Sequence, residues 1–500
     1  MTDVTAGAPA PPVYSNGYKT LVLGMLLAAY TFNFIDRTII ATIGQAIKVD
    51  LKLTDTQLGL LGGLYFALLY TTLGIPIARL AERKSRVNII TWSLIIWSGF
   101  TALCGAAQNF VMLAILRFGV GIGEAGCSPP SHSLISDYFE PKKRATALSI
   151  YAFGIPLGTM IGAVAGGWLT QAFSWRVAFV VVGLPGLILA VLFKLLVKEP
   201  PRGHSDIVEH PIEPEDVTAP VAPEPKPFSM ANEFSELWGV AKVLFGKWPV
   251  LHMVLGVTIA SFGSYGSGAF VPAYFVRQFG LDYATVGLIT GLVGGFSAGI
   301  GTLVGGFVAD RAARKSAIWY PLVPAIGLLI ATPIYIMAYL QNTWQMAALI
   351  LLVPGIFHYT YLGPTFGVVQ NSVPVTQRAT ATALLFFFLN LIALGGGPVF
   401  TGWLSDALGQ FNFSHPGLGV SGLFQGFSGD AGVGDFIKEC PGGKAPEGAA
   451  EALGAACHTA GSMGTRQAII ISLCFYAWAS VHYFLAAIGM VKHMKSTAGG

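Results

Sequence analysis

Four ionisable residues lie inside long apolar stretches of the first half of the chain. Asp36 and Arg37 are neighbours within residues 18–46, and Arg117 and Glu124 lie seven positions apart within residues 109–136. Seven residues make about two helical turns, so Arg117 and Glu124 would share one helix face at heights ~10 Å apart. A lone charge in hydrocarbon costs several kcal/mol, so such residues face a polar cavity or one another. They are therefore the leading candidates for function.

The residue types suggest how these four residues would act. An arginine in a water-filled cavity can grip a carboxylate or a phosphate through two parallel hydrogen bonds. Burial and a neighbouring arginine act in opposite directions on a carboxyl group, so proton binding and anion binding compete. We predict that Asp36 and Glu124 carry protons, that Arg117 anchors an anionic headgroup, and that Arg37 partners an acid. The alternative is a static cluster of ion pairs that only locks the helices together.

A second pattern, an acid followed by basic residues in a short loop, occurs twice. Residues 78–86 read ARLAERKSR and residues 305–315 read GGFVADRAARK, so that Glu82 and Asp310 are 228 residues apart. An acid at the end of one helix can pair with arginine and can cap the N-terminus of a neighbouring helix. Glu82 and Asp310 are therefore predicted gating latches, and the candidate partners are Arg83, Arg144, Arg311 and Arg378. Alternatively, these basic residues serve only to set the topology.

The duplication extends well beyond these loops, but it does not include the four ionisable residues. In the second half, Ser264 and Tyr265 occupy the positions of Asp36 and Arg37, while Leu351 and His358 occupy those of Arg117 and Glu124. The sister half is thus expected to build the same architecture without these charges. This asymmetry favours a functional role for them over a purely structural one.

Composition points to lipid as the solvent for most of the chain. Hydrophobic residues make up 53% and charged residues 11%, whereas a soluble protein carries about 25% charged residues. Twelve apolar stretches are each long enough to cross a bilayer as a helix, and they are unbroken rather than alternating, which argues against a barrel. We predict an all-α integral membrane protein whose twelve transmembrane helices form two pseudo-symmetric six-helix bundles.

Charge placement predicts the topology. Basic residues cluster in alternate loops, such as 79–86 and 311–315, while the short loops at 105–110 and 341–344 carry none. The positive-inside rule then puts both termini in the cytoplasm. The predicted regions are a tail at 1–17, a first bundle at 18–197, a cytoplasmic linker with an interfacial helix at 198–248, a second bundle at 249–491 with an outer loop at 405–465, and a tail at 492–500.

The outer loop contains Cys440 and Cys457, on the side where oxidation is permitted, and they are a candidate disulfide. The histidines show no metal-ligand spacing, and the spans contain no nucleophile–base arrangement. We therefore expect no metal, no cofactor, no catalytic group and no nucleic-acid partner. The expected partners are the bilayer, protons and a small anionic substrate, and the expected state is a monomer.

The chain resembles the major facilitator superfamily over essentially its full length. The strings NFIDR at 33–37 and RFGVGIGEAGCSPP at 117–130 are similar to the bacterial branch of the spinster group. That resemblance implies alternating access and a lysophospholipid or sphingosine-phosphate substrate. Symporters of sugar acids carry a similar pattern. The gating loops depart from the usual pattern, because Glu82 replaces an aspartate, and Ser85 and Ala313 replace glycines.

The rest of the predicted cavity wall favours an amphipathic anion. Aromatic residues are plentiful in the relevant spans, and the second half offers few amides that could bind sugar hydroxyls. The candidate lining residues are Phe32, Asn33, His358, Tyr361 and Phe387. We predict a proton-coupled transporter of an anionic lipid in a bacterial inner membrane. The alternatives are a sugar-acid symporter and a transporter-like sensor.

Overall fold

The structure, a computed structural model, describes residues 14–205, 230–374, 377–416 and 435–498, and every regular element in these ranges is a helix. Twelve helical segments are long and apolar enough to cross a membrane. The predicted all-α membrane fold is therefore confirmed.

The first bundle contains six of the spanning segments. Three are single helices and three are broken by a bend or a π-helical turn. They are α1 (Asn16–Thr42), α3–η1–α4 (Asp55–Gly59, Leu60–Leu64, Tyr65–Arg83), α5 (Arg86–Cys104), α6–α7 (Phe110–Glu124, Ser128–Tyr138), α8–α9 (Pro141–Ala152, Gly154–Ala172) and α10 (Trp175–Leu196).

The second bundle repeats this plan. Its segments are α13 (Trp248–Phe279), α14–η2–α15 (Tyr283–Leu292, Val293–Ser297, Ala298–Ala313), α16 (Trp319–Tyr339), α17–α18–η3–α19 (Trp344–Leu351, Pro354–His358, Tyr359–Tyr361, Leu362–Asn371), α20–η5–α21 (Arg378–Phe388, Leu389–Leu394, Gly395–Ser414) and α24 (Glu451–Ala498).

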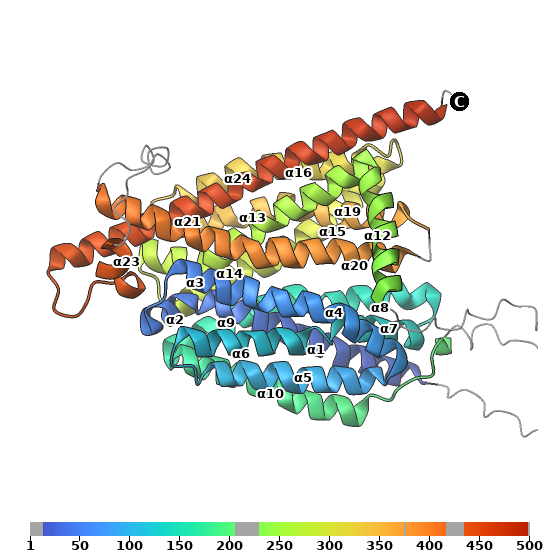
Figure 1. Ribbon diagram of the computed structural model, residues 1–500, viewed down its shortest axis with the longest axis horizontal. Helices are drawn as coiled ribbons and strands as arrows, with labels where there is room; N and C mark the ends of the chain where they lie inside the picture. Colours follow the sequence, from blue (N-terminus) through green and yellow to red (C-terminus); the bar gives the residue numbers. More distant parts are fainter. Residues whose placement is uncertain (1–13, 206–229, 375–376, 417–434, 499–500) are drawn as a thin grey trace, which may run out of the picture.

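The two bundles lie side by side with their helices running along the long axis of the molecule (Figure 1). One end carries the short helices α2 (Gly44–Leu51) and α23 (Asp435–Glu439) and a disulfide between Cys440 and Cys457, so we call it the disulfide end. The opposite end carries residues 197–205 and α12 (Met230–Gly246), and we call it the linker end. Helix α12 runs across the linker end, at a steep angle to the spans (Figure 1).

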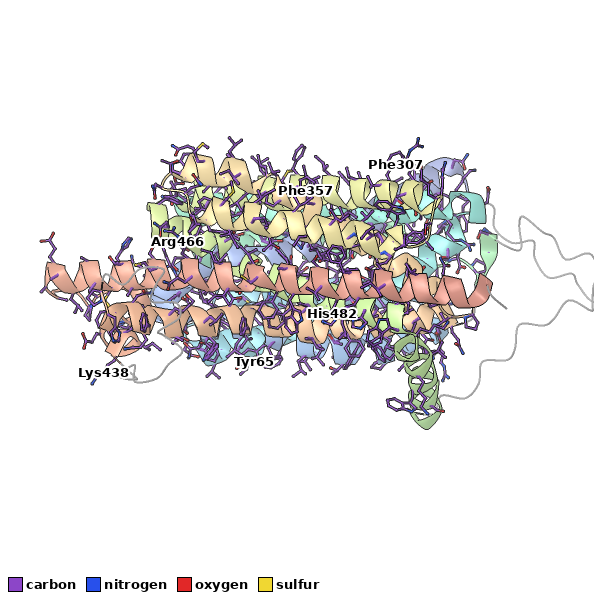
Figure 2. All side chains as sticks on the ribbon, turned by 90° about the horizontal axis from the view of Figure 1, so that it is seen from above. Tyr65, Phe307, Phe357, Lys438, Arg466 and His482 are labelled. Atoms are coloured by element: carbon purple, nitrogen blue, oxygen red, sulfur yellow. A yellow bond between two sulfur atoms is a disulfide. The ribbon has the colours of Figure 1, made fainter. Side chains whose placement is uncertain are left out.

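The side chains follow the chemistry of a protein in lipid. Large apolar residues on the outer faces of the bundles are strongly exposed, among them Leu195, Leu303 and Phe307, and side chains project from all sides of the bundle (Figure 2). In water such an apolar surface would favour aggregation, but in a bilayer it is the surface that contacts lipid. Short polar side chains cap the N-termini of several spanning helices. For instance, Thr54 forms a capping box with Gln57 at the start of α3.

Backbones of the two bundles touch near the disulfide end. A Cβ added at Gly402 of α21 would lie 2.2 Å from the Asp55 carbonyl oxygen, and one at Gly167 of α9 would lie 2.2 Å from the Tyr283 carbonyl oxygen. Only glycine allows such approaches. The bundles are therefore held in close contact at this end.

The predicted outer loop at 405–465 is shorter in the structure. Helix α21 continues to Ser414 and α24 begins at Glu451. The extra turns are polar, and this composition predicts a loop, but their side chains bind other parts of the protein. The Asn412 amide nitrogen donates to Gln467 at 2.8 Å, and Asp406 accepts from the Asp55 backbone nitrogen at the start of α3. The Cys440 and Cys457 Cα atoms lie 5.6 Å apart across the disulfide.

Candidate functional site

The structure brings together two of the four predicted charges by direct contact. The Arg37 Nε donates to the Glu124 Oε2 at 2.7 Å, joining α1 to the last residue of α6. The Glu124 side chain is fully buried, whereas that of Arg37 is 18% exposed. Asp36 and Arg117 are also buried. We call these four residues the central charge cluster.

Glycines in α6 allow this cluster to form. A Cβ at Gly121 would lie 2.7 Å from the Phe66 carbonyl oxygen, and one at Gly123 would lie 2.5 Å from the Trp97 backbone nitrogen. Helix α6 therefore packs directly against the backbones of α4 and α5, which brings Glu124 to a depth where it meets α1. The sequence GVGIGE thus sets the position of the acid as well as its identity.

Aromatic rings surround the guanidinium of Arg37. Its central carbon lies 4.5 Å from the ring centre of Tyr70, 5.0 Å from that of Phe66 and 5.1 Å from that of Phe34. Cation–π attraction stabilises a guanidinium that is withdrawn from water. Phe66 and Tyr70 are not among the predicted lining residues, although their i, i+4 spacing puts both on one face of α4.

The central charge cluster contains polar atoms without partners. Asp36 Oδ2 accepts a hydrogen bond from the Thr101 hydroxyl at 3.1 Å, and Arg117 Nε donates to the Leu61 carbonyl oxygen at 3.3 Å. Among the described residues, Asp36 Oδ1, Glu124 Oε1 and Arg117 Nη1 are buried and have no hydrogen-bond partner. An unpartnered buried polar group costs about 1–3 kcal/mol. Each of these atoms is therefore a place where a proton, a water or a ligand group would be stabilised.

The candidate lining residues lie in different surroundings. Asn33, His358 and Tyr361 are buried, Phe32 is half-buried, and Phe387 is exposed. His358 lies among tyrosine rings of the second bundle, with its Nδ1 3.4 Å from the Tyr335 hydroxyl. At the position that aligns with Glu124, the second bundle thus presents an aromatic core.

Among the described side chains, no ion pair joins a predicted gating residue of one bundle to the other bundle. Glu82 pairs with Arg79 of its own helix at 3.1 Å, and Arg83, Asp310 and Arg311 are exposed. Arg144 donates to the Ser136 carbonyl oxygen at 2.9 Å within the first bundle. The side chain of Arg378 lies outside the described residues. Within the described ranges, no ion pair joins the two bundles at the linker end.

Another arginine of the same loop is buried. Arg86 contacts Asp137 and also donates from Nε to Glu199 at 2.7 Å. The sequence predicts Arg86 only as one of the loop's basic residues. Its partner Asp137, the acid in ISDYF at 135–139, was the feature of the sequence that could have indicated a buried ion pair.

A second buried charge cluster joins the bundles at the disulfide end. Asp55 of α3 binds Lys48 of α2 at 2.7 Å and both terminal nitrogens of Arg277 of α13 at 2.6 and 2.7 Å. Asp406 of α21 accepts from the backbone nitrogens of Asp55 at 2.9 Å and Thr56 at 2.7 Å. We call Lys48, Asp55, Arg277 and Asp406 the interbundle cluster.

This cluster corrects the expectation that buried charges occur only in the first half. Arg277 and Asp406 come from the second half, and both are buried. They lie at the ends of apolar stretches, where a sequence pattern cannot distinguish a residue facing water from one buried between two bundles. Arg277–Asp55 is the one ion pair between bundles in the described part of the chain.

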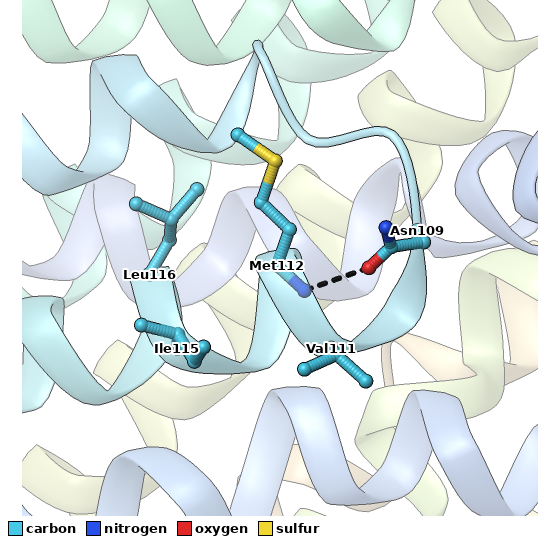
Figure 3. Close-up of a pocket in the computed structure, with 5 residues that line it drawn as sticks. All are labelled: Asn109, Val111, Met112, Ile115 and Leu116. Carbon is cyan, nitrogen blue, oxygen red and sulfur yellow. Dashed lines mark hydrogen bonds between the residues drawn. The ribbon is translucent and has the colours of Figure 1, made fainter.

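An apolar pocket of about 440 Å³ lies at the start of α6 (Figure 3). It is lined by Asn109, Val111, Met112, Ile115 and Leu116, and the Asn109 side chain is occupied in capping Met112 N at 2.9 Å. Because Val111 and Ile115 are strongly exposed on the outer face of the bundle, this pocket is a groove facing lipid and does not suit an ion.

Comparison with known proteins gives consistent matches. The family model described as Major Facilitator Superfamily matches residues 26–398 and 253–499. The chain is 31% identical over 386 residues to an MFS-type efflux pump of Mycolicibacterium smegmatis, covering 77% of this chain and 84% of that protein. It is 28% identical over 402 residues to the hexuronate transporter of Bacillus subtilis, covering 79% of this chain and 90% of that one.

Among solved structures, the fold is similar to that of a bacterial homolog of the human lysosomal transporter Spinster, crystallised in an inward-facing and unoccupied conformation. The TM-score is 0.77 and the identity 33%, over 96% of this chain and 99% of that chain. The matched proteins are transporters and not enzymes, as predicted.

Proposed function

Since the chain belongs to the Major Facilitator Superfamily of membrane transporters, we propose that it couples proton movement to the transport of an amphipathic anionic lipid, such as a lysophospholipid or a sphingosine phosphate, by alternating access. One observation carries this proposal. Arg37 is paired with the fully buried Glu124, next to carboxylate oxygens that have no partner within the described residues.

The proposed coupling follows from competition for Arg37. While Glu124 is ionised, it holds the guanidinium at 2.7 Å. A proton on Glu124 weakens this attraction and leaves Arg37 available to an anionic headgroup. Arg117 contributes a second cationic group through its unpartnered Nη1, and Asp36 a second carboxyl for the proton. Proton and anion would then be bound together, and this proposal replaces the expectation that their binding competes.

The apolar surroundings favour a lipid over a sugar acid. The rings of Phe34, Phe66 and Tyr70 surround the anchoring arginine, and they match an acyl chain better than a row of hydroxyl groups. The similarity to a Spinster homolog at 33% identity agrees with this choice.

We also infer the orientation of the protein. The basic loops lie at the linker end, so we assign this end and both termini to the cytoplasm of the cell membrane. The disulfide then lies on the outer, oxidising side. Because the bundles are joined by the interbundle cluster at the outer end, this would be an inward-facing state.

The function is tested by flux into proteoliposomes under a set pH gradient, with a radiolabelled lysophospholipid or sphingosine phosphate as substrate. We expect accumulation that collapses when a protonophore is added. Glu124→Gln and Asp36→Asn should abolish accumulation against the gradient, whereas Asp50→Asn, which changes an exposed acid of the same bundle, should not. Accumulation that persists in Glu124→Gln would contradict the coupling role of Glu124.

A sugar-acid substrate is the second candidate. It is supported by the 28% identity to the hexuronate transporter. In the same liposomes, proton-driven uptake of a hexuronate with no transport of either lipid would show that the substrate is a sugar acid. The proposed proton coupling would then still hold. No flux of any of these substrates would overturn both versions.

A further inference from the structure

A pocket of about 330 Å³ lies at the disulfide end, away from the central charge cluster. It is formed by α2, the end of α13, the turn after Cys440 and the first turns of α24. Its volume is at the lower end of the range for small-molecule sites. It therefore has room for a small anion with a few attached carbons, but not for a long acyl chain.

The lining of this pocket is basic. None of the described lining residues is acidic, and four carry nitrogen donors of cationic or titratable groups: Lys48, Arg277, Lys444 and His458. The neutral polar residues Gln45 and Ser462 complete its polar wall. A concave site with convergent cationic donors and no acid favours an anion.

Lys48 and Arg277 have donor capacity left after binding Asp55. Among the described contacts, Lys48 uses one of its three N–H groups, on Asp55 Oδ1. Arg277 Nη2 uses one of its two, on the same oxygen. Burial lowers the pKa of Lys48, and the charge of Arg277 lowers it further, against the opposing effects of Asp55 and Asp406. Additional negative charge near Lys48 would therefore be stabilised.

The turn that covers the pocket is fixed in position. Gly442 and Gly443 have φ values of 70° and 82°, and a Cβ at Gly442 would lie 2.9 Å from the Lys48 carbonyl oxygen. Only glycine accommodates both the positive φ and the close contact with α2. The disulfide ties this turn to α24, so Lys444 and His458 are held on two sides of one opening.

We propose that this pocket is a binding site for a phosphate group, held between Lys48, Arg277, Lys444 and His458. Lys48 belongs to the first bundle and Arg277 to the second, so the bound anion contacts both. It thereby stabilises the conformation in which the bundles are joined at the disulfide end. The phosphate could be inorganic phosphate or the headgroup of a lipid, because both offer the same oxygens.

The test measures binding and not transport, so its outcome is independent of the proposed function. The full-length protein in nanodiscs of zwitterionic lipid is titrated with radiolabelled inorganic phosphate by equilibrium dialysis. A parallel arm adds nanodiscs that contain phosphatidic acid and asks whether this lipid competes with inorganic phosphate. Competition assigns the site to a lipid headgroup as well, and its absence restricts the site to the free anion.

Lys444→Gln is the informative variant because Lys444 is exposed and its loss should leave the fold intact. Its control is Lys438→Gln, an exposed lysine of α23 at the same end that does not line the pocket (Figure 2). We expect saturable phosphate binding that is at least tenfold weaker in Lys444→Gln and unchanged in Lys438→Gln. Absence of saturable binding, or equal weakening in both variants, would overturn the proposal.

Discussion

Replacing Arg277 by glutamine should shift the molecule away from the conformation described here. Arg277 forms the ion pair between the second bundle and Asp55 of the first, and the Ser405 hydroxyl of α21 also donates to Asp55 Oδ2, at 2.7 Å. In a conformation with the disulfide end open, the two bundles would separate there and this contact would be lost. The substitution therefore destabilises the closed conformation and has little effect on the open one.

The size of the effect can be worked from the contacts. Arg277 donates to Asp55 at 2.6 and 2.7 Å and to the Gln45 side chain at 2.7 Å. A hydrogen bond to a charged group contributes about 1.5–3 kcal/mol. Asp55 keeps Lys48 of its own bundle as a counter-ion. The free energy lost on substitution should therefore be smaller than the cost of leaving a buried carboxylate with no counter-ion. We take about 3 kcal/mol, which corresponds to roughly a 100-fold change in the equilibrium.

The assay is a distance distribution between spin labels on exposed residues at the disulfide end, one on each bundle. Gln108 and Asn342 suit this purpose, and the exposed Cys474 is first replaced by alanine. The control is Arg176→Gln, which breaks an ion pair with Asp50 that lies within one bundle and is about 40% exposed. Such pairs contribute about 0–1 kcal/mol.

We expect a longer-distance population in Arg277→Gln and none in the control. If Arg277→Gln leaves the distribution unchanged, the interbundle cluster does not hold the bundles together. An equal shift in both variants would attribute the effect to general loosening.

Three further predictions use other parts of the chain. Asp310→Asn should leave the conformation described here unchanged, because Asp310 is exposed. It should slow transport if Asp310 acts as a latch when the linker end closes, and an unaltered flux would contradict that role. Replacing Cys440 and Cys457 by serine removes a constraint of about 3 kcal/mol, so the loop between them should exchange its amide hydrogens faster while the spans keep their protection; unchanged loop exchange would contradict this. Burial raises the pKa of Glu199, but hydrogen bonds from a backbone nitrogen and from Arg86 outweigh it and lower the pKa. The ionised Glu199 therefore stabilises the fold at a pH above the usual glutamate range, and this stabilisation is lost as the pH falls through the lowered pKa. Glu199→Gln should lower the unfolding temperature at pH 7, and its unfolding temperature should converge with that of the parent near pH 3. A difference that does not depend on pH would refute this.

Sequence reasoning was sufficient for the architecture. Apolar stretches of spanning length and repeated loops specify a two-bundle membrane fold because both signals are local. The same holds for Asp36 and Glu124, whose charge inside an apolar stretch is visible without any partner.

What sequence reasoning could not give was the pairing of residues from distant segments. It expected an acid for Arg37 but did not identify it, since Glu124 lies 87 positions further along the chain. It also missed the role of Arg277 and Asp406, because both stand at span ends where charged residues ordinarily face water. Burial at these positions is created by the other bundle and is a property of the assembled fold.

The length of α24 has a practical consequence. Its apolar part, Glu451–Val491, contains 41 residues and so measures about 60 Å, at ~1.5 Å per residue. The hydrocarbon core of a bilayer is about 30 Å thick, and the helix projects beyond its neighbours at both ends (Figure 1). A rigid domain fused in helical register to this rod would keep a fixed orientation relative to the bundles. It would give electron microscopy a landmark outside the micelle for a protein of only 52.8 kDa.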